Sequence, residues 1–250
     1  MTAPPPLRAA DAAGADRAPG AAPLSGRGRA LHGAVFMVTA LTVITQFLLT
    51  GTGPFDPSEP DPGPIPSMVR FFSFFTIQST ILVAVTSLLF AMGRPLTPGL
   101  RVLRIDSLVA IVITAVVHWF LLRPLGTEAG IIGILDALLH VVGPALAVLA
   151  WILAGPRTAV GAPRGLGLRV TGAALVFPVL FGAWTFLHGA VTRWYPYPFI
   201  DVPTVGYGPA VGMALGVLVA FIVLAAGLEA VERAAAQVIT ARQAGRDRTR

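Results

Sequence analysis

The 250-residue chain contains no cysteine and no lysine, and only 12% of its residues are charged. Without cysteine, it can form no disulfide, no thiolate nucleophile and no cysteine-ligated metal site. With 55% hydrophobic residues and a mean hydropathy of +0.76, the chain is too apolar for a soluble domain of this size. The sequence therefore indicates an integral membrane protein.

The basic residues, all of them arginine, give a pI near 11. A basic balance can indicate a nucleic-acid partner, but that interpretation needs a basic face on a recognisable fold, and these arginines lie between hydrophobic segments. We therefore expect the bilayer as the partner, and no nucleic acid. The absence of lysine, together with abundant alanine, glycine and proline, reflects GC-rich coding and is typical of a bacterial source.

Six apolar segments are each about as long as a membrane span, since a helix needs roughly twenty residues to cross a hydrocarbon core of about 30 Å. We predict an all-α polytopic membrane protein, with a six-transmembrane-helix bundle at residues 31–230, a disordered cytoplasmic tail at residues 1–30 and a basic cytoplasmic tail at residues 231–250. The predicted spans are Leu31–Leu49, Phe71–Met92, Val102–Leu122, Ile131–Leu153, Leu168–Leu187 and Val205–Leu228.

The distribution of arginine predicts the orientation. Only Arg70, Arg123 and Arg193 fall in the first, third and fifth loops, and every other arginine falls in the tails or in the second and fourth loops. Cytoplasmic loops retain arginine, so we place both termini in the cytoplasm, with the bacterial plasma membrane as the expected location. The first outer loop, residues 51–66, is so rich in proline that we expect extended chain and no helix.

The fourth span contains the side chains that are most costly to bury in lipid, Asp136 and His140. Their spacing of four places both on one face of a helix. Pro144 has no N–H to donate to the carbonyl of His140, so the helix should kink or loosen there. Because ionisable groups inside a span cost several kcal/mol unless they are paired or hydrated, the pair predicts a functional cavity.

Other polar side chains converge on the same outer half of the membrane: Ser73, Thr76 and Gln78 early in the second span, His118 late in the third and His188 late in the fifth. Each alone has an ordinary structural explanation, since hydroxyls and amides bond within or between helices and histidines near span ends are commonly interfacial. Taken together with the fourth span, they predict one polar centre.

Two kinds of chemistry fit this centre. If a hydroxyl of the second span faces His140, the imidazole can accept its proton as the hydroxyl attacks an acyl carbon. If none does, the Asp136/His140 pair can move protons or bind a ligand in a non-enzymatic transporter or binding protein. A third hypothesis is a purely structural or assembly role, which side chains filling the cavity would favour. No metal-ligand spacing is present, so we predict neither metal nor cofactor.

Three runs, at residues 71–80, 136–144 and 191–199, are similar to a bacterial six-span branch of the androgen-induced / FAR-17a membrane protein family. Animal members are threonine hydrolases of fatty acid esters of hydroxy fatty acids. The resemblance implies Thr76 as the nucleophile and His140 as the base. Ser73 aligns with the family threonine if the run is shifted by three, and the spacing from histidine to proline is one residue shorter here.

We therefore expect an intramembrane lipid-ester hydrolase that takes a long-chain acyl substrate laterally from the bilayer into an outward-facing cavity. The sequence gives neither the actual substrate nor the oligomeric state. The expected catalytic residues are Thr76 and His140, the supporting residues are Asp136, Gln78, Ser73, His188 and His118, and the substrate-binding residues are Trp194, Tyr197 and Phe199.

Overall fold

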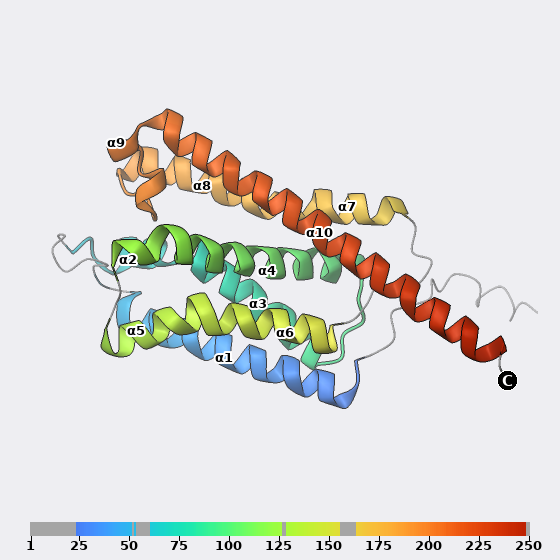
Figure 1. The fold of residues 1–250 in the computed structure, drawn as a ribbon. Helices are drawn as coiled ribbons and strands as arrows, with labels where there is room; N and C mark the ends of the chain where they lie inside the picture. The colour runs from blue at the N-terminus through green and yellow to red at the C-terminus, as the bar shows by residue number, and fades with distance from the viewer. Residues whose placement is uncertain (1–23, 52, 54–60, 127–128, 156–163, 249–250) are drawn as a thin grey trace, which may run out of the picture.

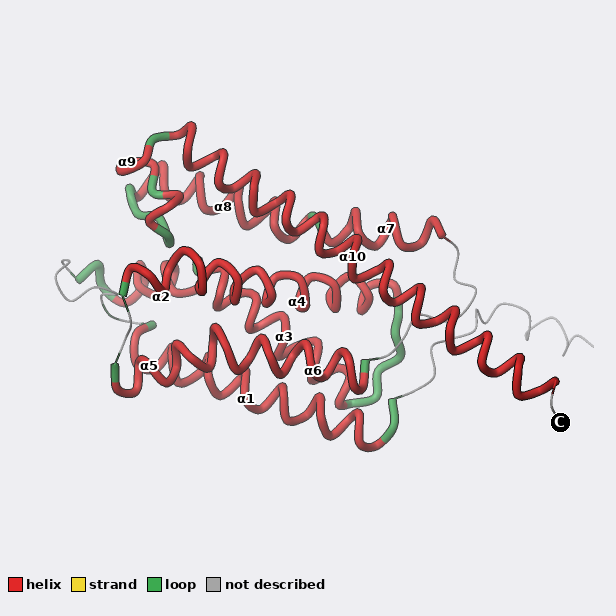
Figure 2. Tube along the Cα trace, viewed as in Figure 1, coloured by secondary structure: helices red, strands yellow, loops and turns green. Residues whose placement is uncertain are grey.

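The computed structural model describes residues 24–51, 53, 61–126, 129–155 and 164–248. Every regular element in these ranges is a helix, which confirms the all-α prediction (Figure 2). Five helical segments are long and apolar enough to cross a membrane, and up to six if α2 (Pro64–Phe72) and α3 (Phe75–Ala91), which are bent by 67°, form one span. These helices indicate a membrane-embedded protein, and the exact number of crossings stays a prediction.

Most of the long segments are composite, because short π- or 3₁₀-helical turns interrupt them. From the N-terminus they are α1 (Gly26–Thr50); α4 (Pro98–Val117) with the π-helix η1 (His118–Leu122) and the 3₁₀ turn η2 (Arg123–Leu125); α5 (Gly130–Ala137), the π-helix η3 (Leu138–Val142) and α6 (Gly143–Ala154); α7 (Arg164–Ala174) and α8 (Val176–Thr192); then η4 (Pro198–Ile200), α9 (Val202–Val205) and α10 (Tyr207–Arg248).

The helices are arranged around α4 (Figure 1). Helix α1 packs against α3 and α6, and α4 packs against α3, α6, α7 and α10. Of the most apolar stretch of the α4 span, 56% is buried, against at most 28% in the other long spans. We call the end where α1 ends and α2, α5 and α10 begin the site end, and the end where α4 begins the arginine end.

The proline-rich loop contains more helix than the sequence analysis allowed. Helix α2 begins at Pro64, so the prediction of extended chain as far as Pro66 is wrong for its last residues. The reason is positional: N–H groups in the first turn of a helix have no intrahelical acceptor, and the fixed φ of proline suits that turn. Residues 52 and 54–60 of this loop lie outside the described residues.

Helix ends also differ from the expected boundaries. Helix α1 begins at Gly26, because the Ser25 side chain accepts a hydrogen bond from the Gly28 N–H and caps the helix. It therefore includes residues that we had assigned to the tail, whereas residues 1–23 lie outside the description. The fifth predicted span is broken at Leu175, because Pro178 cannot donate to the carbonyl of Ala174, where α7 ends. Helix α10 continues to Arg248 through the predicted tail.

An apolar layer crosses the middle of the bundle. Val35 of α1, Val83 of α3, Ile111 of α4, and Ala147 and Ala150 of α6 are all buried against one another. Along α3 and α4, this layer lies between the polar residues of the site end and those of the arginine end. It separates two polar clusters, one at each end of the bundle.

Candidate functional site

Thr76 lies at a sharp bend in the chain. Helices α2 and α3 meet at 67°, Phe74 between them is extended, and Thr76 is the second residue of α3. N–H groups in the first turn of a helix have no intrahelical acceptor, and the helix dipole leaves a positive partial charge there. The hydroxyl of Thr76 is therefore in a position that favours a negatively charged oxygen.

His140 lies within hydrogen-bond distance of this hydroxyl. The Oγ1 atom of Thr76 is 3.2 Å from Nε2 of His140, although the two residues are 64 positions apart in the sequence. A nucleophile and its general base need this proximity. The structure thus brings together the two residues that depth and spacing had selected, and their catalytic roles stay a prediction.

Asp136 orients the imidazole from its other side. Nδ1 of His140 is 2.8 Å from Oδ1 of Asp136 and 3.0 Å from the backbone carbonyl oxygen of Asp136. A carbonyl oxygen can only accept, so Nδ1 carries the hydrogen in the neutral ring. The lone pair of Nε2 then faces the Thr76 hydroxyl, which is the tautomer that a base needs.

His118 completes the cluster by stacking on His140. The ring centroids are 4.0 Å apart with an angle of 10° between the planes, and Nε2 of His118 lies 3.6 Å from Oδ2 of Asp136. The carboxylate therefore faces one imidazole with each oxygen. A single acidic group holds two rings that come from different spans.

Both histidines lie in π-helical turns. His118 begins η1, and His140 lies within η3, four residues before Pro144. The widened turn lets the N–H of Gly143 donate to the carbonyl of Leu138, five residues back. The loosening expected before Pro144 is therefore present as a π-helix, a feature that is frequent at functional sites.

The cluster contains residue types that bind metal ions. One ligand atom each of His118, Asp136 and His140 lies within 4.8 Å of the others. A tetrahedral zinc ion at about 2.0–2.2 Å requires lone pairs that converge on one centre. The stacked rings keep their lone pairs in nearly parallel planes, so convergence would require a ring to rotate. The observed arrangement fits a hydrogen-bonded relay better than a metal centre.

The side chain of Tyr197, from the loop before η4, contacts the start of α3 beside Thr76. The sequence predicts Gln78 as a supporting residue in this part of the site. The backbone N–H of Thr76 donates to the Tyr197 hydroxyl over 3.4 Å, and the Tyr197 side chain is buried. Burial raises the pKa of the Tyr197 phenol, which keeps it protonated. Because its oxygen accepts from Thr76, its own hydrogen can be donated.

Two cavities meet at Thr76. A polar cavity of about 340 Å³ and an apolar pocket of about 80 Å³ share Thr76, Leu122 and Tyr197 in their walls. The polar cavity is also lined by Gln46, Thr50, Phe71, Phe74, Ile77, Ile132, Asp136, Leu139, His140 and Pro196. The apolar pocket is lined mainly by residues of α4, α8 and α10.

Two expected site residues have other partners. The Ser73 hydroxyl donates to the carbonyl of Val69 at 2.7 Å and accepts from the Trp184 indole at 2.8 Å. The side-chain amide of Gln78 donates to the carbonyl of Phe72 at 2.8 Å. The structure therefore does not bring Ser73 or Gln78 to His140, which favours Thr76 as the nucleophile.

The remaining expected residues lie beside the site. His188 stacks on Trp184 with ring centroids 5.3 Å apart, and Trp194 packs edge-on against Phe74. Phe199 stacks on Tyr197 at 5.3 Å and lines the apolar pocket. Of the three residues expected to bind substrate, Tyr197 and Phe199 line a cavity, whereas Trp194 lines neither cavity and contacts Phe74, which lines the polar one.

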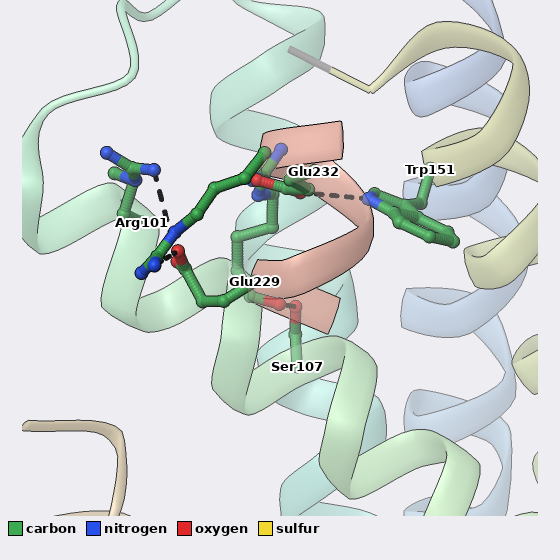
Figure 3. Close-up of polar contacts among 7 residues, drawn as sticks. Arg101, Ser107, Trp151, Glu229 and Glu232 are labelled. Atoms are coloured by element: carbon green, nitrogen blue, oxygen red, sulfur yellow. Dashed lines mark hydrogen bonds and ion pairs between the residues drawn. The ribbon is translucent and has the colours of Figure 1, made fainter. Parts of the chain in front are cut away.

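A second polar cluster, which the sequence analysis missed, lies at the arginine end (Figure 3). Arg104 of α4 forms an ion pair with both oxygens of Glu232 of α10, and the Trp151 indole donates to the same carboxylate at 3.0 Å. Arg101 lies 3.9 Å from Glu229. Both glutamates are buried. Their spacing of three along a continuing helix was the available signal.

Comparisons with protein-family models, with curated protein sequences and with solved structures found no match for this chain.

Proposed function

We propose that the protein is an intramembrane lipid-ester hydrolase in which Thr76 is the nucleophile and His140 the general base and acid. One observation carries the proposal: the Thr76 hydroxyl, the His140 imidazole and the Asp136 carboxylate form a continuous relay, with distances of 3.2 and 2.8 Å. Nucleophilic catalysis requires this order of groups. It is also the activity that the resemblance to the androgen-induced / FAR-17a family implies.

The reaction proceeds in two balanced steps. Oγ1 of Thr76 attacks the ester carbonyl carbon, and its proton passes to Nε2 of His140. The bond from carbon to the leaving oxygen breaks, and the alcohol leaves with that proton. Water then attacks the acyl-threonine, gives a proton to His140, and the fatty acid leaves as Thr76 recovers its proton. Asp136 stabilises the imidazolium that exists between proton transfers.

The developing oxyanion needs hydrogen-bond donors. Tyr197 supports this role because its hydroxyl lies 3.4 Å from the backbone nitrogen of Thr76 and because the residue lines both cavities. The first turn of α3 adds the positive end of a helix dipole. Preorganised donors of this kind are commonly the largest single contribution to catalysis of acyl transfer.

The apolar pocket, with a volume of about 80 Å³, accommodates the first few methylenes of the acyl chain next to the ester. Its walls come from α4, α8 and α10, with aromatic rings from Phe181, Phe186 and Phe199. Each buried methylene contributes about 0.8 kcal/mol of binding free energy. An acyl chain entering laterally between helices reaches Thr76 from this side, and the alcohol part then occupies the polar cavity.

The proposal includes six crossings of the bacterial plasma membrane, with the site end on the outer side and both termini in the cytoplasm. The arginine distribution supports this orientation. The apolar layer through Val83 and Ile111 separates the site from the arginine-end cluster. That layer supports an enzyme over a transporter, because a transporter needs a polar path that reaches both sides.

The test is hydrolysis of long-chain esters by full-length protein purified in detergent, together with covalent labelling by a long-chain fluorophosphonate. We expect turnover and labelling by the wild type and by Ser73→Ala. We expect Thr76→Ala to lose both, and His140→Ala to lose at least about a thousandfold in turnover. Thermal unfolding checks that each variant is folded. Labelling that survives in folded Thr76→Ala, or turnover that depends on Ser73, would refute the proposed nucleophile.

A further inference from the structure

The polar cavity beside Thr76 contains the groups that meet the alcohol part of the substrate, and it is larger than the apolar pocket. Gln46 and Thr50, at the site end of α1, form one wall, and Phe71 and Phe74 form another. Asp136 and His140 also line the cavity. The cavity therefore combines hydrogen-bonding groups with one carboxylate.

No arginine is among the described residues that line this cavity. The guanidinium of Arg70 lies over the Trp194 ring at 5.2 Å, and that of Arg123 lies over the Trp119 ring at 4.1 Å. Arg193 is exposed. These are the three arginines that the sequence places at the site end, and residues 52, 54–60 and 127–128 add acidic residues but no basic one. A substrate carboxylate in the cavity would meet Asp136 with no guanidinium among the described lining residues to offset its charge.

The hydrogen-bonding wall favours hydroxyl groups instead. The side-chain amide of Gln46 donates to the Thr50 hydroxyl at 2.9 Å, and that hydroxyl donates to the backbone carbonyl of Gln46 at 2.9 Å. An amide side chain offers both a donor and an acceptor to a ligand hydroxyl. Neutral alcohols can form such bonds without bringing a charge next to Asp136.

We infer that the alcohol part of the substrate is an uncharged polyol, with glycerol as the simplest example, and that esters whose alcohol part carries a carboxylate are poor substrates. The inference rests on the proposed hydrolase function and deepens it. It also departs from the substrate that the family resemblance implies, since an ester of a hydroxy fatty acid carries a free carboxylate on its alcohol side.

The test compares kcat/KM of the full-length protein for two esters of the same fatty acid, palmitoylglycerol and the palmitoyl ester of hydroxystearic acid. We expect the wild type to favour the glycerol ester by at least about tenfold, because of the like charge of Asp136. We expect Gln46→Arg, which adds a cation to the cavity, to reduce this preference by about tenfold. The matched control Gln46→Met has a similar length and no charge, and should lose only roughly three- to tenfold on the glycerol ester.

Each outcome decides the inference. Equal or better turnover of the hydroxystearic ester by the wild type overturns it and leaves the hydrolase function intact. An unchanged preference in Gln46→Arg also overturns it. Absence of glycerol-ester turnover overturns it in every case, and fluorophosphonate labelling of Thr76 then shows whether the proposed function fails as well.

Discussion

The two polar clusters of this bundle each contain a carboxylate, but they differ in burial and in arrangement. At the arginine end, Arg104 and Glu232 are 3% and 2% exposed and their charges are paired directly. At the site end, Asp136 is 34% exposed, two imidazoles face it, and one of them faces a neutral hydroxyl. The adjoining cavities measure about 20 Å³ and about 340 Å³.

These differences distinguish the arginine-end cluster, which stabilises the packing of the helices, from the site-end cluster, which can transfer a proton. A buried ion pair whose two charges already neutralise each other has no proton to move, and a cavity of about 20 Å³ holds little more than one water molecule. A hydroxyl, an imidazole and a carboxylate in sequence, beside space for a substrate, can transfer a proton. Burial of charge inside a span is therefore a weak indicator of function until its partners and its free space are known.

The largest effect that we expect is on stability at the arginine end. Glu232→Ala leaves Arg104 buried without its carboxylate and should cost about 3–5 kcal/mol of unfolding free energy. The double variant Arg104→Met/Glu232→Leu removes both charges and should recover most of that loss. Thermal unfolding in detergent measures both. A Glu232→Ala protein as stable as the wild type would remove the structural role assigned to this cluster.

The next effect is on catalysis at the site end. Tyr197→Phe removes the proposed oxyanion donor and should lower kcat roughly a hundredfold, equivalent to about 2.7 kcal/mol, with little change in KM. Because burial raises the pKa of Tyr197, ionisation of this phenol should cause no loss of activity below about pH 10 in the wild type.

Tyr195→Phe is the matched control for this variant. Tyr195 is buried against Gly189 and lines neither cavity at Thr76. We expect its removal to leave kcat within about twofold, because no donor to the reacting atoms is lost. If the two variants lose activity equally, the loss reflects general packing of the loop, and Tyr197 is not the oxyanion donor.

A smaller effect, on stability and activity together, should follow from adding a side-chain methyl at Gly143, directly after the π-helical turn η3. A Cβ atom on Gly143 would lie 2.8 Å from the backbone carbonyl oxygen of Leu138, so Gly143→Ala must displace η3 at a cost of about 1–3 kcal/mol. Because His140 lies in the same turn, activity should fall along with stability. Gly172→Ala is the control, since an added Cβ there meets nothing within 4 Å. Equal stability of the two variants would show that the turn is not sterically specified.

The smallest effect that we expect is at Gln78, and it tests whether this residue belongs to the catalytic site. Its amide donates to the carbonyl of Phe72 across the bend between α2 and α3. Gln78→Met should cost no more than about 1 kcal/mol of stability and leave kcat unchanged. A tenfold fall in kcat at unchanged stability would show that Gln78 supports the reaction, as the sequence predicts.

The sequence predicted the parts of the fold that depend on hydropathy. The apolar segments are helices of about the expected extent, and the polar positions Thr76, Asp136 and His140 meet because each lies at a similar depth in its own span. Depth along a helix can be counted from residue numbers at about 1.5 Å per residue. That is why proximity of Thr76 and His140 could be anticipated.

Rotation of each helix about its axis could not be counted in the same way. Ser73 and Gln78 lie near the right depth, but only the packed structure shows that neither faces His140. Tyr197 lies in the loop before η4, and its contact with Thr76 depends on the path of that loop. The burial of Glu229 and Glu232 depends likewise on the packing of α10 against α4, and hydropathy alone places glutamates in water. The prediction of extended chain as far as Pro66 was wrong because composition does not show where in a proline-rich loop a helix begins.

The π-helical turn before Pro144 also keeps the same face of the helix buried before and after the turn. Leu135, Leu139, Gly143 and Ala147 are buried at a constant spacing of four residues, which in an ordinary α-helix drifts by about 40° at each step. A turn that contains more residues than usual absorbs part of that drift, so both halves of the span remain in register with the helices that cover them. Winding the same residues as an ordinary α-helix would add roughly one residue of rotation, about 100°, and would turn Asp136 by that amount relative to α6. The chain therefore encodes the position of its base partly through the number of residues in a turn.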